Sequence, residues 1–580
     1  MQRRATIVIA AALMCAPNLA LAESAFPPTV GGEAAAAIRI LTPQDVQRYQ
    51  LIFDYEKRGK FEEADAQISA LTDDCLMGYV RAEHHLSPKS GRTPLKVLNE
   101  WLDRFGDLSI ADRIFKLANR RAKHTNVDVN DIPTFRRRGG GYEEFDIPPP
   151  PLASDDSRAI QTQIEPLVKA GQPDAALSLL QEFELSHPLP PVDEARLSQR
   201  IAASYLAEGY EQKSYDLAIQ QMSPSIPLMH WIAGLAAYRL GQFKNAAVQF
   251  EILAKDSSVP NFIRSQAAFW AARAYGQAGE ALRVISFLNA AAREQPTFYG
   301  ILAERVLGMP GHTTFTDGPV DEASFRALMQ VPAARRAVAL WQVGRLGDVP
   351  NEMNRALAAI DIKLTTTYAK VAHAMGLSNL ELRSSEMSAS RGEMLAGLFP
   401  VPVYAPENGY RIDPSLLLAF VRAESRFRPD ATSSAGAKGL MQLLPSTAAH
   451  INGGDAGDLS DPGHNLALGQ LYLTRLLDSM GDNLVQLAAS YNAGPGNATR
   501  WMGKPSITAD ALLFMESIPS PETRIYVKRI LMYHWLYARR LGRDTPSLDQ
   551  TARGDWPKYH PTGRLESVPL EQKTRAAASP

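Results

Sequence analysis

A carboxylate at the end of an apolar helical pattern is the residue best placed for acid–base chemistry. Glu424 shares one predicted helical face with Leu417, Phe420 and Val421, because these residues recur at spacings of three and four. Burial against apolar side chains raises the pKa of a carboxyl group, so the group can keep a proton near neutral pH and protonate a leaving oxygen. The spacing also fits a Glu that is partly exposed or paired with a nearby arginine, and periodicity alone leaves both interpretations open.

A segment of small side chains follows this carboxylate. Arg428-Pro429 ends the helical pattern, and the run DATSSAGAKG then lets backbone approach a ligand closely. Gln442 lies just beyond it, in LMQLLPSTA, where a second helical pattern begins. An amide beside a wall of small residues suits hydrogen bonds to acetamido and hydroxyl groups, which sugars offer; a plain loop is the alternative.

Two further signals concern the elements that position these residues. Asp413-Pro414 fits the N-cap and first position of a helix, since Asp can accept a backbone N–H and Pro needs no donor there. Farther along, Leu484, Leu487, Ala488 and Tyr491 share a helical face that Gly494-Pro495 ends. Tyr491 is therefore expected at a helix end, either as a core residue or with its hydroxyl in a cleft.

Composition narrows the class of protein. The chain has 580 residues, a formal net charge of −1 and 45% hydrophobic residues, which is ordinary for a globular protein and gives no sign of a nucleic-acid partner. The apolar run after Arg3-Arg4 is shorter than the ~20 residues of a spanning helix. We expect a signal peptide at residues 1–22, cleaved after Ala22, and a periplasmic protein. With only Cys15 and Cys75, no internal disulfide is expected, and no metal site or cofactor is predicted.

Helical periodicity dominates the rest of the chain and predicts an all-α fold. We expect a helical region at 23–125, a Pro/Gly-rich linker at 126–157, an α-superhelix at 158–398, a compact domain at 399–542 and a flexible tail at 543–580. Within 158–398, WIAGLAAYRLGQFKNAAVQFEILAK and AFWAARAYGQAGEALRVISFLNAA align in register, with a Gly turn between two helical patterns. This pattern is typical of tetratricopeptide-like hairpins, which stack into a solenoid; ordinary helical packing is the alternative.

The order of residues from Glu424 to Gln442 resembles the signature of the lytic transglycosylases of the soluble Slt type. It reads E-S-x-F-x-P-x-A-x-S-x-A-G-A-x-G-L-M-Q, and three later blocks agree in order: HNLALGQLYL, AASYNAGPG and FMESIPSPETRIYVKRIL. The resemblance is strong over the C-terminal domain. The N-terminal region resembles the family only in its helical character. It implies an N-terminal superhelix and a goose-type-lysozyme-like catalytic domain that acts on peptidoglycan.

The resemblance also assigns expected roles to individual residues. Glu424 would be the single catalytic acid and then base, in a reaction that cleaves peptidoglycan glycan strands and leaves a 1,6-anhydromuramoyl end. The residues expected to bind substrate are Ser433, Met441, Gln442, Tyr491, Asn492 and Glu522. Asn492 is equally well explained by tying helices together.

Two other functions remain open at this point. A hydrolytic muramidase would use water and a second carboxylate, and Asp430, Asp455, Asp458 and Asp461 all lie in predicted loops. A solenoid scaffold could recruit other cell-wall enzymes without catalysis. A monomer is expected.

Overall fold

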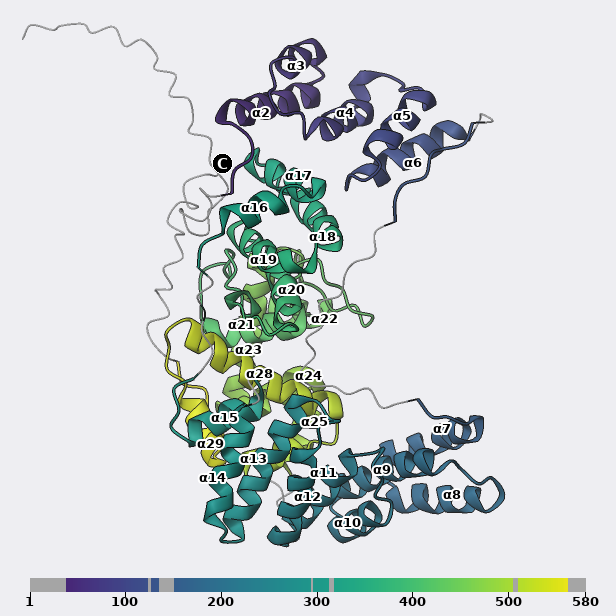
Figure 1. Ribbon diagram of the computed structural model, residues 1–580, viewed down its shortest axis with the longest axis vertical. Helices are drawn as coiled ribbons and strands as arrows, with labels where there is room; N and C mark the ends of the chain where they lie inside the picture. The colour runs from purple at the N-terminus through teal and green to yellow at the C-terminus, as the bar shows by residue number, and fades with distance from the viewer. Residues whose placement is uncertain are drawn as a thin grey trace, which may run out of the picture. The chain divides into compact units, whose positions relative to one another are not determined.

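The computed structural model describes residues 38–123, 127–134, 151–293, 296–311, 315, 318–503 and 510–561, and these residues fold into helices joined by loops (Figure 1). They contain no strand, only isolated bridges such as the one between Thr432 and Lys438. The predicted all-α class is therefore confirmed. None of the helices in these ranges combines the length and the apolar character that a bilayer span requires.

The helices group into two units by their contacts. The first contains the N-terminal helices together with three helices from residues 320–360. Its elements are α2 (Pro43–Arg58), α3 (Phe61–Ile68), α4 (Met77–Leu86), η1 (Pro88–Ser90), α5 (Leu95–Phe105), α6 (Ala111–Ala122), α16 (Glu322–Leu328), α17 (Pro332–Gln342) and α18 (Val349–Ala359).

Buried polar contacts explain why these distant segments belong to one unit. Glu352 is fully buried and accepts hydrogen bonds from Tyr79 Oη at 2.7 Å, from the Ser109 amide at 2.7 Å and from Arg336 Nε at 2.9 Å. The side-chain oxygen of Gln342 accepts from the backbone amides of residues 40 and 41. Because an unpaired buried carboxylate is costly, these donors hold α18 to the N-terminal helices.

The second unit begins with helices that pack as consecutive hairpins. They are α7 (Asp155–Lys169), α8 (Pro173–Ser186), α9 (Pro191–Glu208), α10 (Glu211–Gln220), α11 (Leu228–Arg239), α12 (Phe243–Lys255), α13 (Asn261–Gln277), α14 (Ala281–Arg293) and α15 (Phe298–Val306).

The two sequence repeats correspond to the hairpins α11–α12 and α13–α14, each turned by a glycine with positive φ. Gly234 is small for a packing reason, since a Cβ there would lie 2.5 Å from the Phe250 ring. Trp231, Phe250 and Trp270 contact one another and join the two hairpins. The predicted stacking of hairpins is confirmed for these helices.

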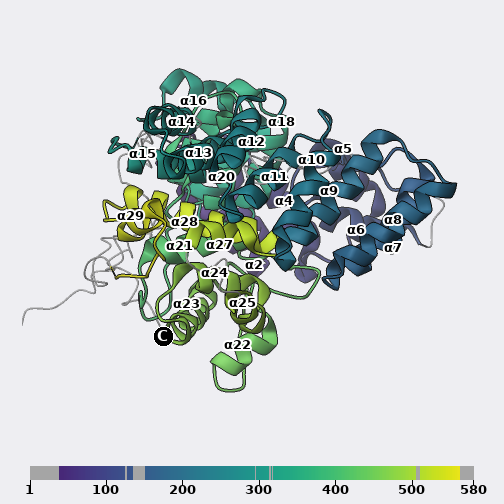
Figure 2. The same ribbon diagram turned by 90° about the horizontal axis from the view of Figure 1, so that it is seen from below.

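The same unit continues into the helices of the C-terminal half. They are η2 (Ile362–Leu364), α19 (Thr365–Ala374), α20 (Ser378–Ala389), η3 (Ala396–Leu398), α21 (Pro414–Glu424), α22 (Pro445–Ile451), α23 (Pro462–Met480), α24 (Leu484–Ala493), α25 (Pro495–Met502), α27 (Ala511–Ser517), α28 (Pro521–Arg540) and α29 (Pro546–Arg553). Figure 2 shows α21, α24 and α28 gathered together, and α28 contacts both of the others.

A buried ionic cluster joins these helices to the hairpins. Glu516 of α27 accepts hydrogen bonds from Tyr299 Oη of α15 at 2.5 Å and from Lys528 Nζ of α28 at 2.9 Å. Arg273 of α13 forms an ion pair with Asp510, which also caps α27. These contacts fix the start of α28 against the hairpin helices.

Two expectations about the connecting segments need correction. The segment predicted as a flexible tail from residue 543 contains helix α29 and stays in contact with the domain beyond it: Leu548 is buried, Asp549 forms an ion pair with Arg305 of α15, and the Tyr559 amide donates to the Asp482 carbonyl. The amphipathic pattern of α29 is short, and the Pro, Arg and Asp residues around it led to the prediction of a flexible tail. The predicted linker also ends earlier than 157, because Ser154 caps α7 and the helix begins at Asp155.

The remaining boundaries stay predictions. The proposed signal peptide at 1–22, the arginine and glycine run at 136–141 and the tail beyond 561 lie outside the described residues. The contacts group 320–360 with the N-terminal helices, whereas the sequence suggested one continuous superhelix over 158–398.

Replacing Glu352 by Ala is predicted to lower the free energy of unfolding of the first unit by about 3 kcal/mol, because buried Arg336 would keep only its ion pair with Asp107 and the Tyr79 hydroxyl would lose its acceptor. Thermal unfolding followed by circular dichroism measures this change. Glu322→Ala on α16, whose ion pair with Arg326 is long and exposed, is the control and should change stability by less than about 0.5 kcal/mol. Equal effects of the two substitutions would contradict the assignment.

Candidate functional site

Glu424 lies at the C-terminal end of helix α21. Asp413 caps the helix by accepting from the Ser415 amide at 3.0 Å, and Pro414 occupies the first position, as the sequence predicted. Leu417 and Phe420 are buried, so the face they share with Glu424 points into the domain. Glu424 is the last helical residue, which places its carboxyl group at the edge of the core.

The Glu424 carboxyl is held by one tyrosine. Tyr526 of α28 donates its hydroxyl proton to Glu424 Oε1 at 2.5 Å, and the tyrosine ring itself is buried. Among the described residues, Oε2 has no hydrogen-bond partner. One oxygen is thus fixed by α28, and the other is available for proton transfer.

Burial dominates the protonation of this group. It raises the pKa of Glu424 from its ordinary 4.5 to about 7; the Tyr526 hydrogen bond opposes this rise, and the negative charge of Glu522 adds to it. The direction agrees with the expectation from the apolar helical face. A carboxylic acid with this pKa is partly protonated at neutral pH and can act as either acid or base.

The chain turns abruptly after Glu424. Arg426 and Phe427 both have positive φ, at 53° and 62°, and Gln442 at the far end of the loop has a φ of 46°. Non-glycine residues adopt this region rarely, and such conformations concentrate at functional sites. Phe427 is buried, so packing of its ring stabilises the turn.

Asn465 at the start of α23 fixes the loop that follows. Its Oδ1 accepts from the Met441 amide at 2.8 Å, and its Nδ2 donates to the carbonyls of Lys438 and Leu459. Gly439 approaches so closely that a Cβ would overlap the Leu459 carbonyl oxygen. The small-residue loop is therefore held from behind by a buried amide.

Ser433 and Gln442 lie in this loop, and both side chains contribute to its shape. Ser433 Oγ accepts from the Ala437 amide at 3.0 Å. Gln442 Nε2 donates to the carbonyls of Gly439 and Ala431 at 2.9 and 3.1 Å. Both side chains remain partly exposed, and their contacts with a ligand stay predictions.

Met441 was expected to bind substrate, and in the structure it packs inside the domain. Its side chain is fully buried and fills the space above Gly469, where a Cβ would lie 2.6 Å from Met441 Cγ. The side chain therefore supports the loop from below, and a contact of Met441 with substrate stays a prediction. Its carbonyl oxygen instead accepts the hydroxyl of Tyr491 at 2.6 Å, so Met441 positions the loop and that tyrosine.

Tyr491 and Asn492 end α24 beside α28. The Tyr491 ring packs against Phe420 with centroids 4.8 Å apart, close enough to Glu424 for their charges to interact. Asn492 accepts from Thr523 Oγ1 at 2.7 Å and donates to the exposed carboxylate of Glu522 at 3.4 Å. The structure thus brings Tyr491, Asn492 and Glu522 together around the Glu424 end of α21, with Asn492 tying α24 to α28.

The other acidic residues considered from the sequence serve local structure. Asp458 accepts from the Ser460 amide, Asp461 caps α23, and Asp455 accepts from the Gly457 amide. Asp430 is exposed. Glu522 is the carboxylate that acts electrostatically on Glu424.

Sequence reasoning missed the roles of Tyr526 and Asn465. Tyr526 shares a helical face with Thr523, Val527 and Ile530, all buried, and this spacing marked a packed face without revealing that a polar atom on it meets Glu424. Asn465 follows an Asp-Pro helix start, where it resembled an ordinary first-turn residue. Both lie in sequence blocks that the resemblance had singled out.

Residues 402–514 match the family model described as the Transglycosylase SLT domain. The soluble lytic murein transglycosylase of Escherichia coli K12 is 40% identical to this chain over 148 residues, and that of Salmonella typhimurium is 38% identical over 142 residues. The first match spans 24% of this chain and 23% of the relative, and the second 23% and 22%. The chain thus matches about a quarter of the length of these curated relatives.

Solved structures extend the likeness in fold beyond this domain. The lytic transglycosylase Slt of Pseudomonas aeruginosa, solved as an inactive mutant, has a TM-score of 0.54 at 20% identity and covers 86% of each chain. A 70-kDa soluble lytic transglycosylase in complex with bulgecin A has a TM-score of 0.53 at 18% identity, covering 89% of this chain and 99% of that one. The fold is therefore the superhelix with a lysozyme-like domain, as in these lytic transglycosylases, and residues 402–514 are similar to the Transglycosylase SLT domain.

Proposed function

We propose that the protein is a peptidoglycan lytic transglycosylase. It cleaves the β-1,4 bond between N-acetylmuramic acid and N-acetylglucosamine and leaves a 1,6-anhydromuramoyl end. The observation that carries this proposal is the half-buried Glu424 carboxyl at the end of an apolar helix face, held by Tyr526, whose pKa of about 7 suits one group to serve as acid and then as base. The match of residues 402–514 to the Transglycosylase SLT domain supports the same chemistry.

The first step uses the protonated form of Glu424. Its proton passes from Oε2 to the glycosidic oxygen, the bond to the anomeric carbon breaks, and the N-acetylglucosamine leaves as an alcohol. The acetamido oxygen of the muramoyl residue bonds to the anomeric carbon and forms an oxazolinium ion. Tyr526 keeps the carboxyl oriented throughout, because its hydroxyl engages Oε1.

The second step uses the ionised form. Glu424 removes the proton from the muramoyl C6 hydroxyl, O6 attacks the anomeric carbon, and the oxazolinium ring opens. The attacking group is already part of the bound sugar, so no water is consumed and the entropic cost of bringing in a second reactant is avoided. Burial of the carboxylate makes it a stronger base than an exposed glutamate.

The residues around Glu424 suit recognition of sugar substituents. In this proposal, the partly exposed Ser433 and Gln442 bind the N-acetyl group and neighbouring sugar atoms. Tyr491 orients the reacting ring from the opposite side, and Asn492 with Glu522 extends the cleft along α28. Their hydrogen bonds within the protein fix their positions before substrate binds.

The proposal includes location and partners. Export by the N-terminal segment would bring the protein to the periplasm, where glycan strands are its substrate, and we expect a single chain to act alone. The relatives whose names specify murein support this location. Recruitment of other cell-wall enzymes by the superhelix stays a prediction.

Replacing Glu424 by Gln is predicted to reduce turnover of purified peptidoglycan by at least roughly a thousandfold, because the acid and base are removed while Tyr526 keeps a hydrogen-bond acceptor. Mass spectrometry of the released muropeptides should find products with 1,6-anhydro ends, lighter by one water than hydrolysis products, from the wild type only. Glu407→Gln changes an exposed glutamate of the same domain and is the matched control, expected to retain activity.

Near-wild-type turnover by the Glu424→Gln variant would contradict the assignment of Glu424 as the acid and base. Reducing ends in place of anhydro ends would instead identify a hydrolase, in which a second carboxylate activates water.

Removing the Tyr526 hydroxyl is predicted to shift the pH dependence of activity. In the wild type, kcat/KM should fall as pH rises through about 7, because the acid form of Glu424 is lost. The hydrogen bond from Tyr526 stabilises the ionised carboxylate, so Tyr526→Phe should raise the pKa of Glu424 and move this fall upward by about one pH unit. Steady-state rates measured across pH test the shift.

The control for this experiment is Tyr472→Phe, which removes a hydroxyl from the same aromatic group without touching Glu424. Its profile should fall at the same pH as that of the wild type. A downward shift in the Tyr526→Phe variant would show that the hydroxyl favours the protonated form, contrary to the proposal.

A further inference from the structure

Glu424 is the last residue of α21, so the place of its carboxyl depends on how the chain is held just beyond the helix. Helix ends fray, because their last backbone groups have no partners within the helix. Two of the next three residues, Arg426 and Phe427, have positive φ. Consecutive non-glycine residues in this region carry backbone strain, which persists only where surrounding contacts hold it. The contacts that hold this turn therefore also hold the acid.

Contacts close in sequence fix the residues on either side of Arg426. The Phe427 ring is buried. The Ser425 hydroxyl donates to the Val421 carbonyl at 3.2 Å, and the Ser425 carbonyl accepts from the Arg428 amide at 3.3 Å. Arg426, the first residue with positive φ, is held in addition by a helix that lies outside this segment.

That helix is α20, which contacts Arg426 at two points. Asn379, in the first turn of α20, donates from Nδ2 to the Arg426 carbonyl oxygen at 2.7 Å. Glu386, seven residues further along, forms an ion pair with the Arg426 guanidinium. A spacing of seven places both side chains on one face of a helix. One face of α20 therefore binds the backbone and the side chain of the same turn residue, and we call Asn379 and Glu386 the α20 clamp.

The ion pair of the clamp joins a buried group to a partly exposed one. The Glu386 side chain is 1% exposed and that of Arg426 is 36% exposed. Burial raises the pKa of Glu386, and the positive charges of Arg426 and Arg422 oppose this rise. Because an unpaired buried carboxylate is costly, Glu386 favours the arrangement in which the Arg426 guanidinium stays beside it. The side chain of the turn residue is thereby drawn toward α20.

We propose that the α20 clamp positions the catalytic acid. Asn379 and Glu386 hold Arg426 in its left-handed conformation, and this turn keeps the Glu424 carboxyl against the Tyr526 hydroxyl. The inference rests on the proposed function, because it takes Glu424 as the acid and base of that reaction.

The acid thus has two supports from different parts of the chain. Tyr526 of α28 engages the carboxyl itself, and α20 fixes the backbone two residues beyond it. Helix α20 precedes residues 402–514, which match the Transglycosylase SLT domain. Part of the support for the acid therefore comes from outside the matched domain.

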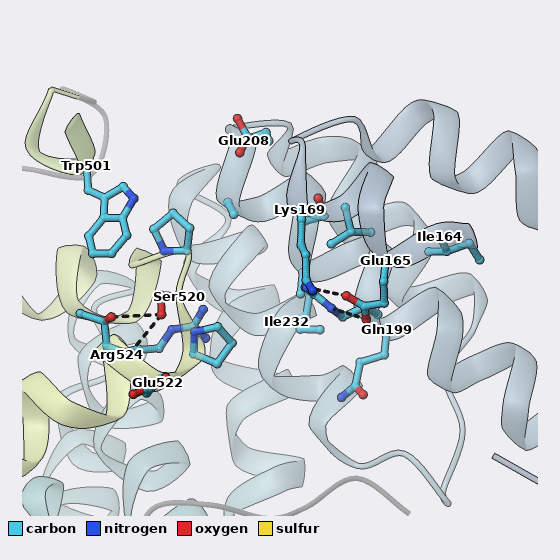
Figure 3. Close-up of a pocket in the computed structure, with 18 of the residues that line it drawn as sticks. Ile164, Glu165, Lys169, Gln199, Glu208, Ile232, Trp501, Ser520, Glu522 and Arg524 are labelled. Carbon is cyan, nitrogen blue, oxygen red and sulfur yellow. Dashed lines mark hydrogen bonds and ion pairs between the residues drawn. The ribbon is translucent and has the colours of Figure 1, made fainter. Parts of the chain in front are cut away.

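The α20 clamp is separate from the cavity of about 890 Å³ that adjoins the site. Figure 3 shows this cavity, with residues of α7, α9 and α11 on one side and Trp501, Ser520 and Glu522 on the other. Of the described residues that line it, none belongs to α20 or to the turn after Glu424. Loss of the clamp should therefore slow the chemical step without weakening the binding of substrate, so that kcat falls and KM stays the same.

Replacing Asn379 by Leu tests the clamp, because Leu has a similar size and no donor for the Arg426 carbonyl. We expect kcat on purified peptidoglycan to fall about tenfold with KM unchanged, since a small displacement of a catalytic group is enough to cost this much. Asn379 is partly exposed, so the variant should fold, with a melting temperature within about 3 °C of the wild type. Glu386→Gln keeps the shape of the buried side chain without its charge and should also lower kcat at constant KM.

Coupling to Tyr526 distinguishes positioning of the acid from a general effect on the fold. If the clamp acts by keeping Glu424 against Tyr526, the double variant Asn379→Leu/Tyr526→Phe should have nearly the same kcat as Tyr526→Phe alone, because the contact is already lost. Losses in kcat that multiply would show independent effects and would overturn the inference.

The matched control is Glu393→Gln, which removes an exposed glutamate just after α20 that also pairs with an arginine, Arg391. It should keep the wild-type kcat and KM. An equal loss of kcat in the control would overturn the inference, as would a rise in KM at constant kcat in the clamp variants. Wild-type kinetics in both clamp variants would overturn it too and would leave the proposed function standing. Absence of 1,6-anhydro products from the wild type would mean that the proposed function itself fails.

Discussion

The site depends on one half-buried carboxyl group, that of Glu424, and on the Tyr526 hydroxyl that holds it. Moving the pKa of Glu424 from 4.5 to about 7 corresponds to about 3 kcal/mol of unfavourable free energy in the ionised form, at about 1.4 kcal/mol per pH unit. The pKa of Glu424 is higher in the folded protein than in the unfolded chain. The contribution of this group to the free energy of unfolding is therefore fully present below pH 4.5 and is lost as the pH rises through about 7. The rest of the domain must offset this cost above neutral pH.

The offset comes from helices that arrive from distant parts of the sequence. Tyr526 can meet Glu424 only if α28 lies against α21, and the start of α28 is held by Glu516, Lys528 and Tyr299 in a buried cluster that reaches α15. The hairpin helices therefore support the position of Glu424 and Tyr526. This dependence gives a physical reason for catalytic and superhelical segments to belong to one packed unit.

Local rules predicted the parts of the site that lie within single helices. The Asp413-Pro414 start, the apolar face leading to Glu424 and the Gly turns of the hairpins follow from capping, periodicity and backbone freedom. Contacts between helices were not predictable in this way, because nothing in a 3.6-residue period says which helix lies opposite. Contacts between helices explain four features that the sequence did not predict. They are the role of Tyr526, the role of Asn465, the burial of Met441 and the packing of α29.

The pKa of Glu424 is the most direct test of the account. It can be followed by ¹³C NMR of the side-chain carboxyl carbon in labelled protein, from about pH 4 to about pH 9, with Glu424→Gln identifying the resonance. A titration midpoint near 7 would agree with a buried group that serves as acid and base. A midpoint near 4.5 would mean an ordinary solvated carboxylate and would contradict the proposed role.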